Sequence, residues 1–274
     1  MRRALAVSAL LTTLGLAACT ASVHGNPARS PVSSAPPASP TTSAPAAPIT
    51  SASSSVSATA SGSASPSARH SSASALPLRF ATGTATRVIT VVAPSSGSTT
   101  ATLRAWQKAG TGWTQVGAAV TAYLGTAGLS AYPSESSTAT PVGSFTLTQA
   151  FGREPDPGTS LPYHQTTPAD WWISQPGPLY NTMQSCVSAC PFTLGNPNEH
   201  LYYEQPYYAY AVVIDYNTAN SQTGVRQGAG SAFFLHVTVG QPTQGCISIA
   251  EQRLVELLRW LVPAAHPRIL IGVG

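Results

Sequence analysis

The chain has 274 residues and a formal net charge of +4 at pH 7. Four arginines within the first 69 residues account for the whole excess, which leaves nine basic against nine acidic side chains in residues 76–274. A neutral folded part lacks the basic surface that steers proteins onto nucleic acid, so we expect no nucleic acid among its partners.

The first 19 residues have the pattern of a secretory signal peptide. Arg2 and Arg3 precede an apolar run over 4–16, which is too short to cross a membrane as a helix. The run ends in Leu-Ala-Ala-Cys19, which resembles the lipobox where bacterial lipoproteins are cleaved and lipid-modified. We predict an exported protein, lipid-anchored through Cys19 at the outer face of the cytoplasmic membrane or in the cell wall. Cleavage without lipid attachment is the alternative.

A low-complexity segment follows. Between residues 26 and 75, 42 of 50 residues are Ser, Ala, Pro or Thr. Such a composition offers few large apolar side chains to bury, so it cannot offset the entropy lost when the chain becomes ordered. We predict a disordered tether over 20–75 and one folded domain over 76–274.

The folded part begins with short segments rich in Thr, Val and Tyr and separated by Gly and Pro, which predicts a mostly β domain. The strands expected first are 86–93, 101–107, 111–116, 120–123 and 142–148. Residues 151–208 then show no clear periodicity and are rich in aromatic residues, which favours a long irregular insertion with a function. Its aromatic side chains fit either the wall of a substrate cleft or packing over a sheet edge: Trp171, Trp172, Tyr202 and Tyr203.

The last part of the chain predicts one helix among strands. Ser248 and Glu251 have the spacing of a capping box, an apolar stripe runs from Leu254 to Val262, and Pro263 ends the helix. The strands expected here are 210–215, 232–238, 245–249 and 268–273.

The cysteines point to a reactive thiol. Cys186 and Cys190 are close enough in the sequence to form a disulfide in an oxidising compartment, and two free buried thiols are the alternative. With Cys19 in the lipobox, Cys246 is left over, and an unpaired cysteine in an exported protein is a candidate for reactivity.

Cys246 is therefore the candidate nucleophile, and its neighbours suit that chemistry. The start of the expected helix at Ser248 would favour a thiolate at Cys246. Gly245 admits a substrate carbonyl, so the backbone N–H groups of Gly245 and Cys246 are candidates for an oxyanion hole. His236, ten residues upstream, is the candidate base. One His and one Cys do not complete a zinc site, so we expect no metal and no cofactor.

The residues around this pair resemble a known family. Phe-Leu-His236-Val is followed by Pro-Thr-Gln-Gly-Cys246-Ile-Ser, and then by the expected helix and final strand. Upstream, Thr140-Pro-Val-Gly-Ser-Phe145 matches a second element, Thr-Pro-x-Gly-x-Phe. Together these motifs resemble the L,D-transpeptidase catalytic domain (YkuD family) of bacterial cell-wall enzymes. The resemblance covers most of 85–274 and is strongest to an actinobacterial lipoprotein branch with an aromatic insertion and a Cys pair.

The resemblance implies a mostly β, sandwich-like domain with Cys246 at the mouth of a cleft, one helix near the C-terminus and a long irregular insertion. It also implies an acyl transfer in which Cys246 attacks the third-residue carbonyl of a peptidoglycan stem tetrapeptide and expels the terminal D-Ala. His236 would act as base, an amine of another stem would resolve the thioester, and carbapenem-type inhibitors would acylate Cys246. Water as the acceptor, giving an L,D-carboxypeptidase, and a non-catalytic peptidoglycan-binding lipoprotein are the alternatives.

Two positions depart from the family pattern. Gln244 stands where the family usually has His, and it can orient a substrate by hydrogen bonding without titrating. Ser248 stands where many members have Arg, so Arg226 or Arg153 becomes the candidate for binding a substrate carboxylate. Thr243 holds the Ser/Thr place of the motif and, with Gln244, Ser248 and Arg226, completes the predicted substrate-binding set.

Overall fold

The computed structural model describes residues 74–274. The predicted signal peptide, the lipobox with Cys19 and nearly all of the predicted tether lie outside the described residues. Within 74–274, no helix has both the length and the apolar character needed to cross a membrane.

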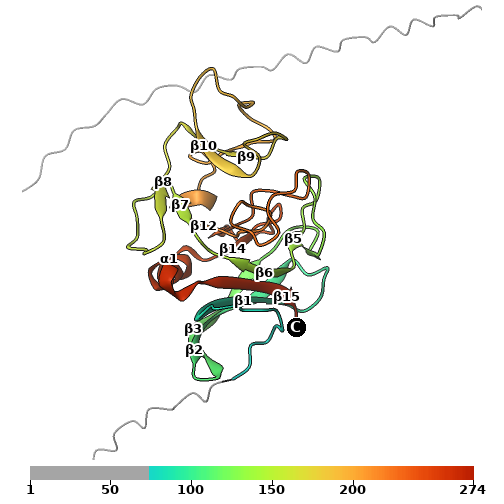
Figure 1. The fold of residues 1–274 in the computed structure, drawn as a ribbon, viewed down its shortest axis with the longest axis vertical. Coiled ribbons are helices and arrows are strands. Elements are labelled where there is room, and N and C mark those ends of the chain that lie inside the picture. Colours follow the sequence, from blue (N-terminus) through green and yellow to red (C-terminus); the bar gives the residue numbers. More distant parts are fainter. Residues whose placement is uncertain (1–73) are drawn as a thin grey trace, which may run out of the picture. The chain divides into compact units, whose positions relative to one another are not determined.

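The largest element is a ten-stranded mixed sheet that curls on itself (Figure 1). In spatial order it contains β6 (Gly143–Thr146), β15 (Arg268–Val273), β1 (Arg87–Ala93), β2 (Thr100–Ala109), β3 (Gly112–Tyr123), β14 (Ile247–Ile249), β13 (Phe234–Val237), β12 (Ala211–Val213), β7 (Ala150–Gly152) and β8 (Tyr163–Gln165).

Residues 74–274 also form two smaller sheets and three helical elements. A two-stranded sheet pairs β4 (Leu129–Ser130) with β5 (Thr140–Pro141), and a three-stranded sheet has the order β10 (Thr182–Ser185), β9 (Asp170–Ile173) and β11 (Glu199–His200). The helical elements are α1 (Glu251–Trp260) and the short 3₁₀ helices η1 (Tyr207–Ala209) and η2 (Pro263–Ala265).

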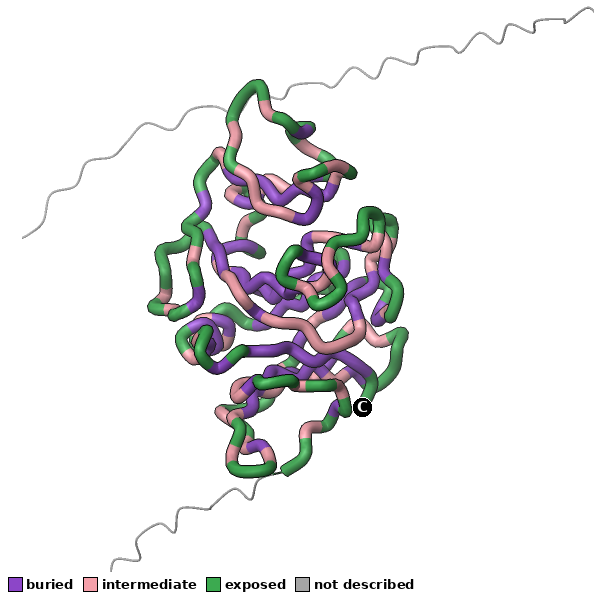
Figure 2. The backbone as a smooth tube through the Cα atoms, viewed as in Figure 1, coloured by how far each residue is buried: buried purple, intermediate pink, exposed green. Residues whose placement is uncertain are grey.

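One apolar core joins the sheet to α1. Ile89 of β1, Leu235 of β13 and Ile269 of β15 are fully buried in one cluster with Leu254 and Leu258 of α1. Burial of each such side chain contributes about 1.5–3 kcal/mol. Buried positions are concentrated in the central strands, while exposed ones follow the loops (Figure 2). The predicted mostly β fold with one α-helix near the C-terminus is therefore confirmed.

The expected break between strands 111–116 and 120–123 is wrong. The two segments form the single strand β3, which pairs with β2 on both sides of a register shift between Leu103 and Ala105, opposite residues 117–119. The last strand, by contrast, has the predicted bounds.

The predicted capping box at the start of the helix is also wrong. Ser248 lies in β14, where it pairs with His236 on one side and Tyr123 on the other, and the helix begins only at Glu251 after Ala250. The sheet ladder satisfies the backbone around Ser248, and this long-range pairing prevails over the local capping preference. Cys246 therefore precedes a strand, and the expected help from a helix N-terminus at the thiol does not apply.

The insertion 151–208 is more ordered than predicted, because it contains the three-stranded sheet as well as β8, η1 and most of β7. Trp171 and Trp172 are adjacent in β9 and both are buried. The indole N–H of Trp172 donates to Asn181 at 2.8 Å. Trp172 is therefore a packing residue, whereas Tyr203 is exposed.

Candidate active site

Two neighbouring parallel strands bring the predicted nucleophile and base together. Cys246 immediately precedes β14, and His236 lies in β13, where it is paired with Ser248. Both side chains line one cavity of about 330 Å³, which we call the thiol cavity. The structure thus places Cys246 and His236 at one site, as the sequence predicted.

The Cys246 thiol is held by the backbone of the strand beside it. The N–H of Phe234 donates to the sulfur at 3.3 Å, and the thiol donates to the carbonyl of Ala232 at 3.2 Å. Burial raises the pKa of Cys246 well above its usual range, and the nearby carboxylate of Glu199 raises it further. The resting side chain is therefore a protonated thiol, buried with only 9 % of its surface exposed.

Ala232, which accepts the thiol hydrogen bond, has a left-handed backbone conformation with φ 56°. Its N–H donates to the side-chain oxygen of Asn181 at 3.1 Å, the same oxygen that accepts the indole N–H of Trp172. Left-handed backbone is unfavourable for a residue with a Cβ, so neighbouring contacts must hold it. The insertion therefore helps to fix the carbonyl that faces the thiol.

His236 is held as a neutral imidazole. Its Nδ1 lies 2.8 Å from the carbonyl oxygen of Val237, so the proton belongs on Nδ1 and Nε2 carries the lone pair. Burial lowers the pKa of His236 to about 4. The rings of Tyr207 and Tyr208 pack edge-on against the imidazole, with centroids 5.9 and 5.5 Å away.

Gly245 is required by the local backbone. Its φ of +128° is one that residues with side chains rarely adopt, and a Cβ there would lie 2.9 Å from the ring of Phe233. Its N–H donates to the hydroxyl of Thr243 at 3.1 Å, and that hydroxyl donates to the carbonyl of Cys246 at 2.6 Å. The Gly245 N–H is thus engaged by Thr243 in this structure, and its predicted role as an oxyanion donor would require this hydrogen bond to be exchanged. The predicted role of Thr243 in binding substrate is joined by one in shaping the loop.

The upstream Thr-Pro-x-Gly-x-Phe element contacts the same loop, which contains Gly245 and Cys246. The hydroxyl of Thr140 is buried, accepts from the N–H of Gly125 at 2.8 Å and donates to the carbonyl of Cys246 at 3.4 Å. Gly143 has φ +148°, and a Cβ on it would lie 2.8 Å from the ring of Phe145. Thr140 of this motif therefore positions the loop that carries Cys246, and Gly143 leaves room for the ring of Phe145.

Two of the predicted substrate-binding residues, Ser248 and Gln244, line the thiol cavity, and no structural role explains their side chains there. Ser248 is buried, and its hydroxyl has no hydrogen-bond partner within residues 74–274. Because His236 and Ser248 are paired in register, the Ser248 hydroxyl lies on the same side of the sheet as the imidazole. Gln244 is exposed where the thiol cavity meets a second, neighbouring cavity. Both can offer polar groups to a ligand.

Arg226 and Arg153, the candidates for binding a substrate carboxylate, do not line the thiol cavity or its neighbour, so the structure does not bring them to Cys246. Arg226 lines a separate cavity of about 210 Å³ together with Asp215 and Arg268. The guanidinium of Arg153 stacks over Tyr202, 4.5 Å from the ring centroid. Both arginines come from loops whose course the sequence does not specify.

The neighbouring cavity, which we call the acidic cavity, has a volume of about 570 Å³. Its walls carry the carboxylates of Glu135, Glu199 and Glu204, and among the described residues that line it His200 is the one basic side chain. Glu199 and Glu204 also line the thiol cavity. Tyr208 lines the thiol cavity but not the acidic cavity. Sequence reasoning missed Glu199 and Tyr208, because neither belongs to a motif. The one available signal was the presence of acidic residues in an insertion otherwise dominated by uncharged side chains.

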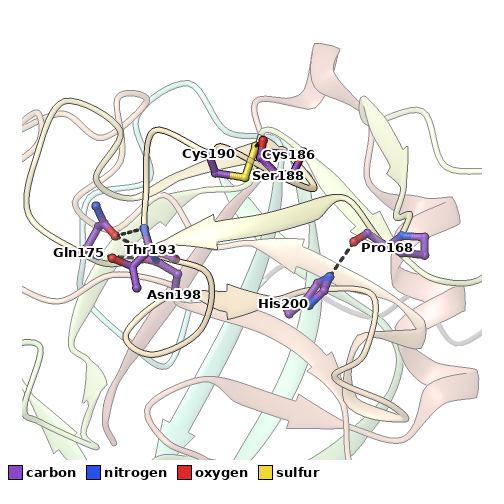
Figure 3. The surroundings of a disulfide bond; sticks show 8 residues. All are labelled: Pro168, Gln175, Cys186, Ser188, Cys190, Thr193, Asn198 and His200. Carbon is purple, nitrogen blue, oxygen red and sulfur yellow. Dashed lines mark hydrogen bonds between the residues drawn. A yellow bond between two sulfur atoms is a disulfide. The ribbon is translucent and has the colours of Figure 1, made fainter.

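The predicted disulfide between Cys186 and Cys190 is present and closes a short loop at the end of β10 (Figure 3). Its neighbourhood is ordered by Asn198, whose side-chain oxygen accepts from the N–H groups of Ser174 and Gln175 at 2.8 and 3.0 Å. The bridge therefore stabilises the insertion at a distance from the thiol cavity, which neither cysteine lines.

The fold and the site together define a mostly β protein with a buried Cys–His pair at the junction of two parallel strands. A model of the YkuD family, the L,D-transpeptidase catalytic domain, matches residues 87–270. The chain belongs to this family, for which peptidoglycan is the implied substrate. No curated protein and no solved structure matched the chain. Within residues 74–274, no three His, Cys, Asp or Glu side chains cluster as they would around a metal ion.

Proposed function

We propose that the protein is a cysteine-dependent L,D-transpeptidase that cross-links peptidoglycan stems. The observation that supports this most directly is the shared cavity of Cys246 and His236, on the strands where the family motifs lie. Cys246 is the nucleophile, and the neutral imidazole of His236, whose Nε2 carries the lone pair, is the base that takes the thiol proton.

In the proposed acylation, the Cys246 sulfur forms a bond to the carbonyl carbon of the third stem residue. We take the backbone N–H of Cys246 as the donor to the oxyanion, because the Gly245 N–H donates to Thr243. The bond to the terminal D-Ala then breaks, and its nitrogen leaves as an amine after taking from His236 the proton that the Cys246 thiol had lost. The free hydroxyl of Ser248 and the amide of Gln244 are candidates for holding the stem peptide.

The acceptor is the second part of the proposal. Glu135, Glu199 and Glu204 give the cavity beside Cys246 a negative character that suits the ammonium group of another stem. Once deprotonated, that amine attacks the thioester, and a cross-link forms with release of the Cys246 thiol. We further propose the export and lipid anchoring at Cys19 predicted above, with the tether spanning the distance to the wall.

The test uses the full-length protein and a carbapenem, followed by mass measurement of the intact chain. We expect an adduct on the wild type and none on Cys246→Ala. An adduct that survives in Cys246→Ala, or a wild type that takes none, would refute the nucleophile.

A second measurement chooses the acceptor. With a tetrapeptide stem as substrate, a cross-linked dimer supports the transpeptidase, whereas a trimmed tripeptide alone would support an L,D-carboxypeptidase.

A further inference from the structure

A third cavity, of about 210 Å³, carries two arginines, and we call it the arginine cavity. Arg268 reaches it from β15 and Arg226 from the loop between β12 and β13. It shares no lining residue with the thiol cavity or the acidic cavity. Its lining side chains bring two guanidinium groups against one carboxylate, that of Asp215, which is a formal charge of +1. The cavity therefore favours an anion.

Arg268 is buried without a carboxylate in contact with it. Only 8 % of its surface is exposed, and its guanidinium donates from Nε to the hydroxyl and from Nη2 to the carbonyl of Ser144, both at 2.8 Å. Its Nη1 makes no hydrogen bond within residues 74–274, and Arg268 takes part in neither of the two ion pairs of that region. A buried charge is unfavourable unless it is paired, so Nη1 is suited to an anionic ligand in the cavity.

The carboxylate of Asp215 is held by other groups. One of its oxygens accepts from the hydroxyls of Thr146 and Thr148 at 2.7 and 2.9 Å, and the other accepts from the hydroxyl of Thr218 at 3.1 Å. Burial lowers the pKa of Arg268 and the charge of Asp215 raises it, so the two charges interact without forming an ion pair. The three hydroxyl donors keep Asp215 apart from the guanidinium, which leaves Nη1 available to a ligand.

The loop that carries Arg226 is fixed by the buried side chain of Asn217. The side-chain oxygen of Asn217 accepts from the N–H of Arg226 at 2.6 Å, and its amide donates to the carbonyls of Arg226 and Gly230 at 2.9 and 2.8 Å. The side chain of Arg226 is exposed and belongs to neither ion pair of the described part of the chain. Arg268 thus lies at the buried end of the cavity, and a second guanidinium without a carboxylate partner lies at its exposed end.

We propose that the arginine cavity binds the carboxylate of a small acid or of a peptide C-terminus between Arg268 and Arg226. Pockets for drug-sized molecules have volumes of about 300–1,000 Å³, so this smaller cavity admits an end group rather than a whole peptide. The planar guanidinium group matches the two oxygens of a carboxylate. A single negative charge balances the lining charge, whereas a phosphate, with a charge of about −2, would leave excess negative charge beside Asp215.

The test is stabilisation of the full-length protein by sodium acetate, with sodium chloride at the same concentration as the reference. A ligand that binds only the folded state raises the melting temperature, so acetate at about ten times its dissociation constant should raise it by about 3–5 °C. Arg226→Gln should weaken acetate binding about tenfold and reduce this rise to about 1 °C at the same concentration. Arg268→Gln should abolish the rise.

Arg104→Gln is the matched control, because it removes from β2 a guanidinium that lines none of the three cavities, and we expect the wild-type rise from it. Modification of arginine by phenylglyoxal, mapped by mass spectrometry to the peptide with Arg226, locates the ligand. Acetate should slow the modification of Arg226 in the wild type and not in Arg268→Gln. If Arg268→Gln does not fold, the exposed position decides, through the loss of the acetate effect in Arg226→Gln.

Two results would overturn the inference. An acetate effect of equal size in the wild type and Arg226→Gln would be a general salt effect and would refute the site. Stabilisation by sodium phosphate that exceeds that by acetate and is lost in Arg226→Gln would mean a phosphate site and would contradict the carboxylate. The inference does not depend on the proposed function: a protein that rejects the carbapenem but keeps the Arg226-dependent effect of acetate would refute that function and leave the arginine cavity as a carboxylate site.

Discussion

The thiol cavity has two walls of different origin. One wall is the junction of β13 and β14, where His236 and Cys246 are held by strand pairing and by the Thr140 and Thr243 hydroxyls. The other is the insertion, which contributes Tyr208 and Glu199 from short elements. The sheet wall carries the proposed nucleophile and base, and the insertion wall adds Tyr208 and Glu199, whose carboxylate raises the pKa of Cys246.

The difference has a physical cause. Sheet register fixes a side chain to within one residue, because a slip would turn every buried side chain outward. The insertion lacks long strands, so it holds its position through aromatic packing and side-chain hydrogen bonds. The edge-on contact of Trp172 with Phe234, at 4.9 Å, and the bond from the Ala232 N–H to Asn181 join the two walls. Tyr208 adds edge-on contacts with Phe234 and His236. Changes in one wall can therefore alter the other mainly through these contacts.

The largest effect is expected in the sheet wall. His236→Ala should reduce turnover of a tetrapeptide stem about 1,000-fold, because the reacting nitrogen atoms lose their proton partner. The measurement is the rate of dimer or tripeptide release, with the fold checked by a thermal melt. Near-normal turnover would refute the role of His236 as the base.

The next largest effect is expected from replacing Trp172, and its neighbour Trp171 serves for comparison. Adjacent strand residues point to opposite sides, so Trp172 packs on Phe151 and Phe234 while Trp171 packs on Phe192 and His200. Trp172→Ala should cost about 3 kcal/mol in the free energy of unfolding and slow carbapenem acylation by loosening the contact between the walls.

Trp171→Ala is the matched control for this prediction. It should cost a similar free energy of unfolding and affect the acylation rate less. Equal slowing by the two changes would contradict the assignment of Trp172 as the contact between the walls.

The two walls also differ in how much of them the sequence reveals. The pairing of Cys246 with His236 and the bounds of the final strand were predictable, because apolar strand patterns and the family motifs are local signals. The position of Ser248 was not, since pairing with His236 and Tyr123 overrode a good local cap. Glu199 and Tyr208 come together only through the three-stranded sheet, whose strands have two to four residues and no readable periodicity.

The smallest effect is expected from the disulfide. Replacing Cys186 and Cys190 by Ser removes a cross-link over a separation of four residues. From loop-closure entropy, this loss should lower the free energy of unfolding by about 2 kcal/mol. The bridge packs beside Trp171 and away from the thiol cavity, so we expect a lower melting temperature and an acylation rate within about twofold of the wild type. Melting temperature and acylation rate are also measured with and without reductant. Reductant should change the wild type but not the double Ser variant, which has no bridge to reduce. A large loss of acylation at a temperature where the variant is fully folded would mean that the outer end of the insertion controls the thiol cavity directly. That result would contradict the assignment of this control to the contacts of Trp172 and Tyr208 with the sheet wall.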